Sequence, residues 1–167
     1  GVPQPAKWHP EIDTGVHIMQ AIDYAANRAW PLATRYAVLT HDLGKSETPV
    51  EILPAHHAHE ARSRELVDAL SMRWKVQRDA AELARGVAAE HGNLGKLKTM
   101  RPATVHDVIA RCDGLRRPER FVQMLDACEA DYSSRRAVGL PESAGQPFVA
   151  RADAMRRPKQ RAVAADG

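Results

Sequence analysis

Hydrophobic residues recur along most of this chain at intervals of three and four, the spacing that places them on one face of an α-helix. No stretch alternates apolar and polar residues for long enough to predict a β-strand. The pattern predicts an all-α fold, a helical bundle with helices over 14–29, 33–43, 56–73, 76–91, 104–113 and 117–136, and a weaker helix near 147–157.

Two long loops are predicted where glycine and proline cluster, at residues 44–55 and 92–103. Gly44 is predicted to be the C′ residue that ends the helix over 33–43. Because that helix is nearly all apolar, we expect it to be buried and its C-terminal end to lie near the centre of the protein.

The chain has 167 residues, the size of one domain, and its 44% hydrophobic content is typical of a globular protein. No apolar run reaches the ~18 residues needed to span a membrane. The start of the chain has no signal-peptide pattern. We therefore expect a cytoplasmic protein that makes no membrane contact.

The net charge of +3 is too small to indicate nucleic-acid binding by itself. The charge is unevenly distributed, since residues 151–167 carry five basic and two acidic side chains. A basic terminus of this kind is usually a solvated end.

The most informative motif is the pair His41-Asp42, placed where the apolar helix over 33–43 is predicted to stop. An imidazole nitrogen with a carboxylate oxygen suits a borderline divalent metal such as Zn, Mn, Co, Ni or Fe. An aspartate at a helix C-terminus is electrostatically unfavourable, so a cation should lie nearby. Either a divalent metal or the side chain of Lys45 would supply that charge.

Two ligands hold a metal poorly, so further residues must complete such a site. For His17, the ordinary alternative is a core histidine that hydrogen-bonds to a neighbour. For the acidic ligand that comes latest in the sequence, Asp113 is the candidate, and Asp107 and Asp131 are alternatives. The candidates, each on a separate predicted helical segment, are His17, His59, His91 and Asp113.

The order His, His-Asp, His, His, Asp resembles the HD superfamily of metal-dependent phosphohydrolases. Five segments are also similar to the HD domain of bacterial CCA-adding tRNA nucleotidyltransferases, and the resemblance covers residues 9 to about 135. It implies an HD-superfamily helical bundle over 9–140, after an N-terminal extension over 1–8 and before a C-terminal helix and basic tail over 141–167. The segments are HPEIDTGVH (9–17), HDLGK (41–45), HHAHEA (56–61), RRPERF (116–121) and EAD (129–131).

The resemblance implies a role for each candidate and a divalent metal cofactor, one of Ni, Mn, Co, Zn or Mg. The chain departs from some relatives at Ala110 and Gly92, where they have acidic residues. The implied metal ligands are His17, His41, Asp42 and Asp113. The implied catalytic residues are His41, Asp42, His59 and His91, and the residues implied to bind the substrate phosphate are Lys45, Arg116 and Arg117.

The implied reaction is hydrolysis of 2′,3′-cyclic phosphodiesters, 2′-nucleotides and simple phosphomonoesters, with tRNA or nucleotide 2′,3′-cyclic phosphates as partners. The metal would lower the pKa of a bound water and polarise a phosphoryl oxygen. Such an activity would act beside CCA addition in the same polypeptide, in tRNA end repair. The sequence contains no Asp-x-Asp pair of the kind that holds Mg²⁺ and NTP, so we expect no nucleotidyltransferase active site in this chain.

Two other interpretations remain open. The chain could be a catalytically vestigial helical module for tRNA binding or dimerisation. In the second case its partner would be a second copy of the chain, in a homodimer. The observation behind this alternative is the group of basic residues Arg116, Arg117, Arg120, Arg135 and Arg136, together with the basic tail. The third interpretation is an HD hydrolase of dNTPs or signalling nucleotides, which the segments similar to CCA-adding proteins disfavour.

Overall fold

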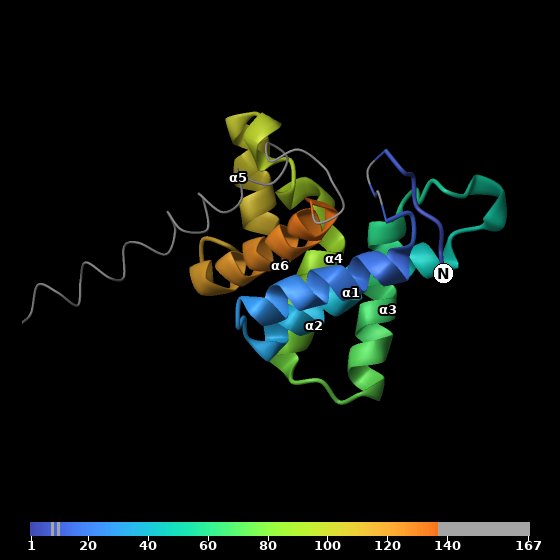
Figure 1. Cartoon of the computed structure of the whole chain (residues 1–167). Coiled ribbons are helices and arrows are strands. Elements are labelled where there is room, and N and C mark those ends of the chain that lie inside the picture. The colour runs from blue at the N-terminus through green and yellow to red at the C-terminus, as the bar shows by residue number, and fades with distance from the viewer. Residues whose placement is uncertain (8, 10, 137–167) are drawn as a thin grey trace, which may run out of the picture.

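The computed structural model describes residues 1–7, 9 and 11–136, which form an all-α structure (Figure 1). All six helices predicted up to residue 136 are present, and no β-strand occurs among the described residues beyond one isolated bridge between Pro3 and Asp13. The predicted helix near 147–157 and the basic tail lie outside the described residues, and the domain boundaries stay predictions. The helices are α1 (Thr14–Asn27), α2 (Leu32–Thr40), α3 (His59–Arg73), α4 (Arg78–Leu94), α5 (Pro102–Arg111) and α6 (Pro118–Arg136).

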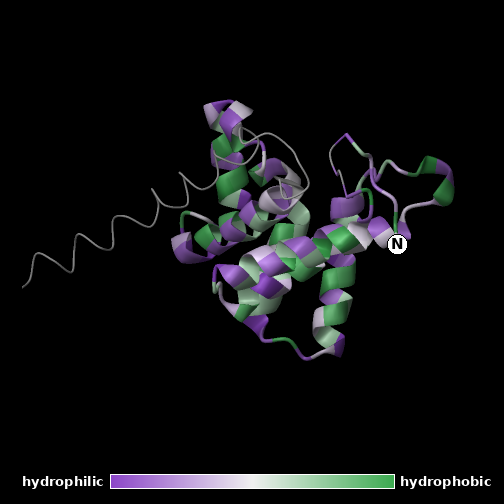
Figure 2. Cartoon of the chain, in the orientation of Figure 1, coloured by the Kyte–Doolittle hydropathy of each residue, from purple (hydrophilic) through white to green (hydrophobic). Residues whose placement is uncertain are grey.

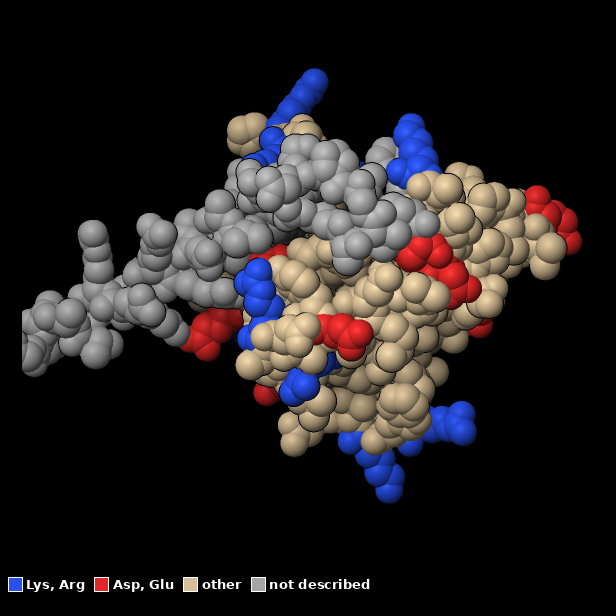
Figure 3. Space-filling view, in the orientation of Figure 1, with Lys and Arg blue, Asp and Glu red and all other residues tan. Residues whose placement is uncertain are grey.

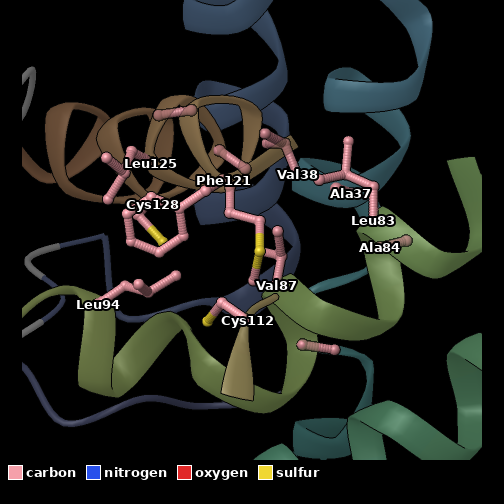
Figure 4. Close-up of a cluster of buried hydrophobic side chains, with 14 of the residues drawn as sticks. Ala37, Val38, Leu83, Ala84, Val87, Leu94, Cys112, Phe121, Leu125 and Cys128 are labelled. Atoms are coloured by element: carbon pink, nitrogen blue, oxygen red, sulfur yellow. The ribbon is translucent and has the colours of Figure 1, made fainter. Parts of the chain in front are cut away.

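Helices α2 and α4 form the centre of the bundle. Helix α2 packs against α1, α4 and α6, and α4 packs against α2, α3 and α6. Each helix carries both hydrophobic and hydrophilic residues, as helices with one buried face do (Figure 2). The core between them includes Val38 from α2, Val87 from α4 and Phe121 from α6 (Figure 4). The predicted burial of the apolar helix is confirmed, since Ala37 and Val38 are fully buried.

Helix α1 shows how a polar residue enters this core. The helix begins after Asp13, whose side chain accepts a hydrogen bond from the backbone N–H of Val16 at 2.9 Å. Its buried side chains, His17, Ala21 and Ala25, recur every four residues and therefore share one face. His17 is thus part of the stripe that packs into the bundle.

The prediction that Gly44 ends the apolar helix as its C′ residue is wrong. Helix α2 ends at Thr40 with His41 as its C-cap, and Gly44 lies in the following 3-10 helix, η1 (Leu43–Glu47). Gly44 is required for a different reason, the close approach of η1 to α3. Its N–H donates to Ser63 Oγ at 2.8 Å, and a Cβ atom at this position would overlap the backbone of both His59 and Ser63.

Gly44→Ala is therefore expected to destabilise the protein by about 1–3 kcal/mol, the usual cost of forcing an extra methyl group into a packed site. Urea unfolding followed by far-UV circular dichroism measures the loss. Gly15→Ala is the matched control, because Gly15 is exposed and an added Cβ would meet only the Asp13 side chain. Equal unfolding midpoints for the two variants would contradict the assigned role of Gly44.

None of the helices in the described part of the chain is both long enough and apolar enough to cross a membrane. Cys112 and Cys128 are buried, and neither forms a disulfide with a described residue. Burial raises the pKa of the Cys112 thiol to about 12, so it stays protonated near neutral pH. The two cysteines therefore act as apolar core residues (Figure 4).

Candidate metal centre

Histidine and aspartate side chains from six elements of the fold converge on one buried cluster. All of their side chains are at most 7% exposed except that of His59, which is 16% exposed. His59 therefore marks the side of the cluster that solvent reaches. The members are His17 of α1, His41 at the C-cap of α2, Asp42 at the start of η1, His59 of α3, His91 of α4 and Asp131 of α6.

One half of the cluster gathers around His41. Its Nε2 atom lies 3.2 Å from Asp42 Oδ2 and 3.7 Å from Asp131 Oδ1. The Nε2 atom of His17 lies 2.9 Å from the same oxygen of Asp131. Potential ligand atoms of His17, His41 and Asp42 all lie within 4.8 Å of one another, a spacing that allows a single metal ion to contact them together.

The other half of the cluster lies across Asp42. The Oδ1 atom of Asp42 is 3.2 Å from His59 Nε2 and 3.5 Å from His91 Nε2. These two imidazole nitrogens are 3.3 Å apart. Asp42, His59 and His91 form a second group with metal-ligand spacing, and it shares Asp42 with the first.

Backbone carbonyl groups fix the orientation of three of the imidazoles. The Nδ1 atom lies 2.8 Å from a carbonyl oxygen in His41 and in His59, and 3.2 Å from one in His91. Because a carbonyl oxygen can only accept, each Nδ1 must carry the proton and donate it. In a neutral ring the Nε2 lone pair then points into the cluster, which is how metal-binding histidines are usually held.

The donor set fits a divalent cation. Three buried atoms that face the cluster, His41 Nε2 and both carboxylate oxygens of Asp42, have charged neighbours but make no hydrogen bond of regular geometry. Burial disfavours charge on His41, yet the carboxylates of Asp42 and Asp131 raise its pKa to about 10. Burial would likewise raise the pKa of Asp42, but His41 and Lys45 hold it well below its usual range. The carboxylates therefore require positive charge between them, which a proton on His41 or a metal ion would supply.

The N-terminal segment supports the cluster from one side. The Oε1 atom of Glu11 lies 3.0 Å from His17 Nδ1 and 2.9 Å from His9 Nδ1. Burial would raise the pKa of Glu11, but hydrogen bonding to His17 is the main influence that lowers it to about 2. A carboxylate on the outer nitrogen of a histidine orients the ring and increases its basicity as a ligand. The sequence analysis assigned no role to Glu11.

Lys45 lies inside the cluster instead of at an open substrate surface. It is 5% exposed, and its Nζ atom lies 2.7 Å from Asp42 Oδ2. The same atom donates to Gln4 Oε1 from the N-terminal segment. Lys45 therefore balances part of the charge of Asp42, as the alternative in the sequence analysis held.

The structure does not bring Asp113 into the cluster. Asp113 follows α5, has a positive φ of 56°, and pairs with Arg116 at 2.6 Å and with Arg117 at 3.5 Å. Asp131, one of the two competing candidates, is 2% exposed and lies between His17 and His41. The other, Asp107, has a side chain on α5 that is 69% exposed. Asp131 thus occupies the position in space that the sequence analysis expected Asp113 to take.

Arg116 and Arg117, expected to bind the substrate phosphate, also lie away from the cluster. Their carboxylate partners are Asp113 and, for Arg117, Glu82 of α4 at 3.4 Å. The sequence did contain a signal for Asp131. The apolar residues Met124, Ala127 and Cys128 follow helical spacing, and residue 131 continues that spacing on the same face.

Comparison with known proteins identifies relatives for this chain. No family model matches it, and no solved structure does. It is 47% identical to the multifunctional CCA protein of Cupriavidus necator over 151 residues, which are 90% of this chain and 36% of the relative. It is 50% identical to the one from Burkholderia ambifaria over 135 residues, which are 81% and 33% of the two chains.

The chain is homologous to bacterial multifunctional CCA proteins, over a segment that makes up about one third of their length. The multifunctional CCA protein of Aromatoleum aromaticum gives the same result, with 46% identity over 149 residues, 89% of this chain and 35% of the relative. The similarity to CCA-adding proteins that the sequence motifs indicated is thereby confirmed. This CCA-protein homologue spans about a third of the length of its relatives, so its own activity has to be argued from its site.

Proposed function

We propose that this CCA-protein homologue is a metal-dependent phosphohydrolase of the HD type. The observation that carries the proposal is the meeting of His17, His41, Asp42 and Asp131 at one buried point, where His41 Nε2 and the Asp42 oxygens make no regular hydrogen bond. We assign these four residues as the metal ligands, with Asp131 in place of Asp113. The imidazole and carboxylate donors suit Ni, Mn, Co, Zn or Mg.

A bound divalent ion would supply a coordinated water of lowered pKa and a Lewis acid for a phosphoryl oxygen. The protein must then bind the phosphate and deliver a proton to the leaving oxygen. His59 is placed for both: its Nδ1 proton is committed to a carbonyl oxygen, and a proton carried on its Nε2 atom, which faces Asp42 at the more exposed side of the cluster, would donate to the phosphate and then pass to the leaving oxygen. His91 lies directly behind it and is kept neutral, since burial lowers its pKa.

The substrates that we propose are 2′,3′-cyclic phosphodiesters, 2′-nucleotides and simple phosphomonoesters. Opening a cyclic phosphodiester forms one bond from water oxygen to phosphorus and breaks one bond from phosphorus to a ribose oxygen. The proton lost by the water balances the proton that the ribose oxygen gains, and His59 Nε2 is placed to pass it on. In the longer relatives, such a reaction would act on tRNA ends beside CCA addition.

The test is hydrolysis of 2′,3′-cyclic AMP by the 167-residue chain after chelation and after resupply of each metal in turn. We expect no turnover in chelator and recovery with at least one of Ni²⁺, Mn²⁺, Co²⁺, Zn²⁺ and Mg²⁺. The same metal salts without protein are the control, because hydrated metal ions hydrolyse cyclic phosphates slowly. If no metal restores turnover above that control, the vestigial module is favoured instead.

A further inference from the structure

A second feature, separate from the histidine cluster, is a cleft lined largely by arginine. It encloses about 610 Å³ between α3, α4 and the α5–α6 turn. Seven arginines line it against three carboxylates, an excess of positive charge greater than the +3 of the entire chain. On the face visible in Figure 3, by contrast, acidic and basic side chains are interspersed. The arginines are Arg64, Arg78, Arg85, Arg111, Arg116, Arg117 and Arg120.

Ion pairs position these guanidinium groups and neutralise part of their charge, since Arg85 pairs with Asp68 at 3.1 Å and Arg111 with Glu90 at 2.8 Å. Glu82 of α4 is within 2.8 Å of both Arg78 and Arg120 and within 3.4 Å of Arg117. One carboxylate therefore holds three cations, and two positive charges remain locally in excess. Arg116 is 70% exposed, so donors on its guanidinium stay available for another anion.

The cleft is suited to phosphate groups. Guanidinium groups bind phosphate oxygens in a bidentate manner, because their planar fork of N–H donors matches the geometry of two phosphate oxygens. None of the residues described as lining the cleft is aromatic, so it offers contacts to a backbone and not stacking platforms for bases. A neighbouring cavity of about 440 Å³ shares Arg116, Arg117 and Arg120 and extends the basic surface around the start of α6.

The cleft and the histidine cluster use the same two helices. Glu90 lines the cleft, and the next residue of α4, His91, faces Asp42. On α3, Arg64 of the cleft lies five residues beyond His59, about 7.5 Å along the helix axis. A polyanionic strand in the cleft would thus run close to the more exposed side of the cluster.

We propose that the arginine cleft binds the phosphodiester backbone of an RNA strand whose end is processed at the histidine cluster. The choice of RNA rests on the proposed function, whereas the affinity for a polyphosphate chain follows from the cleft alone. The cleft would hold the strand without reading its sequence, because phosphate contacts carry no base information.

The test measures binding of a fluorescein-labelled single-stranded oligouridylate to the full 167-residue chain by fluorescence anisotropy, in chelator so that no hydrolysis occurs. The cleft variant is Arg64→Gln with Arg116→Gln. The control is Arg73→Gln with Arg101→Gln, which removes the same charge from exposed positions outside the cleft. Circular dichroism melting verifies that both variants fold.

We expect the cleft variant to bind at least ~10-fold more weakly and the control within ~2-fold of the wild type. The slope of log K against log salt should fall by about 1.4 in the cleft variant, from ~0.7 for each phosphate contact removed. Equal losses in the two variants, no binding at about 50 mM salt, or equal competition by poly-glutamate of the same charge would each overturn the proposal. The last outcome would indicate an acidic protein partner.

The hydrolysis assay separates this proposal from the previous one. Turnover of 2′,3′-cyclic AMP should be unchanged in the cleft variant, while KM for an RNA with a 2′,3′-cyclic end should rise about as much as Kd does. A wild-type chain that binds RNA in chelator but hydrolyses nothing would refute the proposed phosphohydrolase and leave the cleft assignment intact.

Discussion

Asp42→Asn is expected to abolish metal-dependent hydrolysis of 2′,3′-cyclic AMP. The two carboxylate oxygens of Asp42 face His41 and Lys45 on one side and His59 and His91 on the other. An amide removes the charge and replaces one acceptor oxygen by a donor. Loss of a partner outside the ligand shell already costs about 10–100-fold, so we expect kcat/KM to fall by more than ~100-fold.

The control for this variant is Asp107→Asn. Asp107 is a carboxylate on α5 whose side chain is 69% exposed, and its substitution should leave kcat/KM within ~2-fold of the wild type. Metal content measured by mass spectrometry after dialysis should fall in the Asp42 variant alone. Turnover and metal content that survive in Asp42→Asn would refute the assigned centre.

Asp131→Asn and Asp113→Asn should give opposite results, and the pair decides which aspartate completes the site. Asp131 lies 2.9 Å from His17 Nε2 in the buried cluster, whereas Asp113 is held by arginines near the surface. We expect Asp131→Asn to lose more than ~100-fold in kcat/KM and to bind metal more weakly. Asp113→Asn should retain both, because asparagine tolerates the positive φ at this position as well as aspartate does.

Isothermal titration with the metal that best restores turnover measures the affinities of both variants and of the wild type. Thermal melting in chelator shows whether either change affects folding. Full activity in Asp131→Asn together with an inactive Asp113→Asn would overturn this ligand set and restore Asp113, the ligand that the family resemblance implied.

Helix periodicity predicted the bundle well because each helix must bury one apolar face. The six predicted helices match those observed, and their ends shift by up to three residues. The largest local error concerns the end of α2. The sequence analysis took Gly44 as a helix terminator, but the backbone leaves the α-helix at His41 and continues into η1. Glycine occurs there because α3 packs against it, a long-range contact that no local pattern encodes.

The sequence alone determined the all-α class, the relation to CCA proteins, and the position of the pair His41-Asp42 at the end of an apolar helix. These features depend on local periodicity and on motifs that are contiguous in the chain. The convergence of Asp131 with His17 depends instead on how α6 packs against α1, 114 residues away in sequence. Sequence order cannot distinguish Asp113 from Asp131, because both follow the other ligands.

Only the tertiary structure decided what Lys45, Glu11 and the arginines contact. Lys45 is three residues from Asp42 and turns inward because η1 is a tight helix packed on α3. Glu11 reaches His17 because the N-terminal segment folds back along the cluster. The arginines come from α3, α4, α5 and α6 and gather only where these helices meet. The charge and the ligand geometry of a site depend on residues from elements that are distant in sequence, so they are fixed only when those elements pack together.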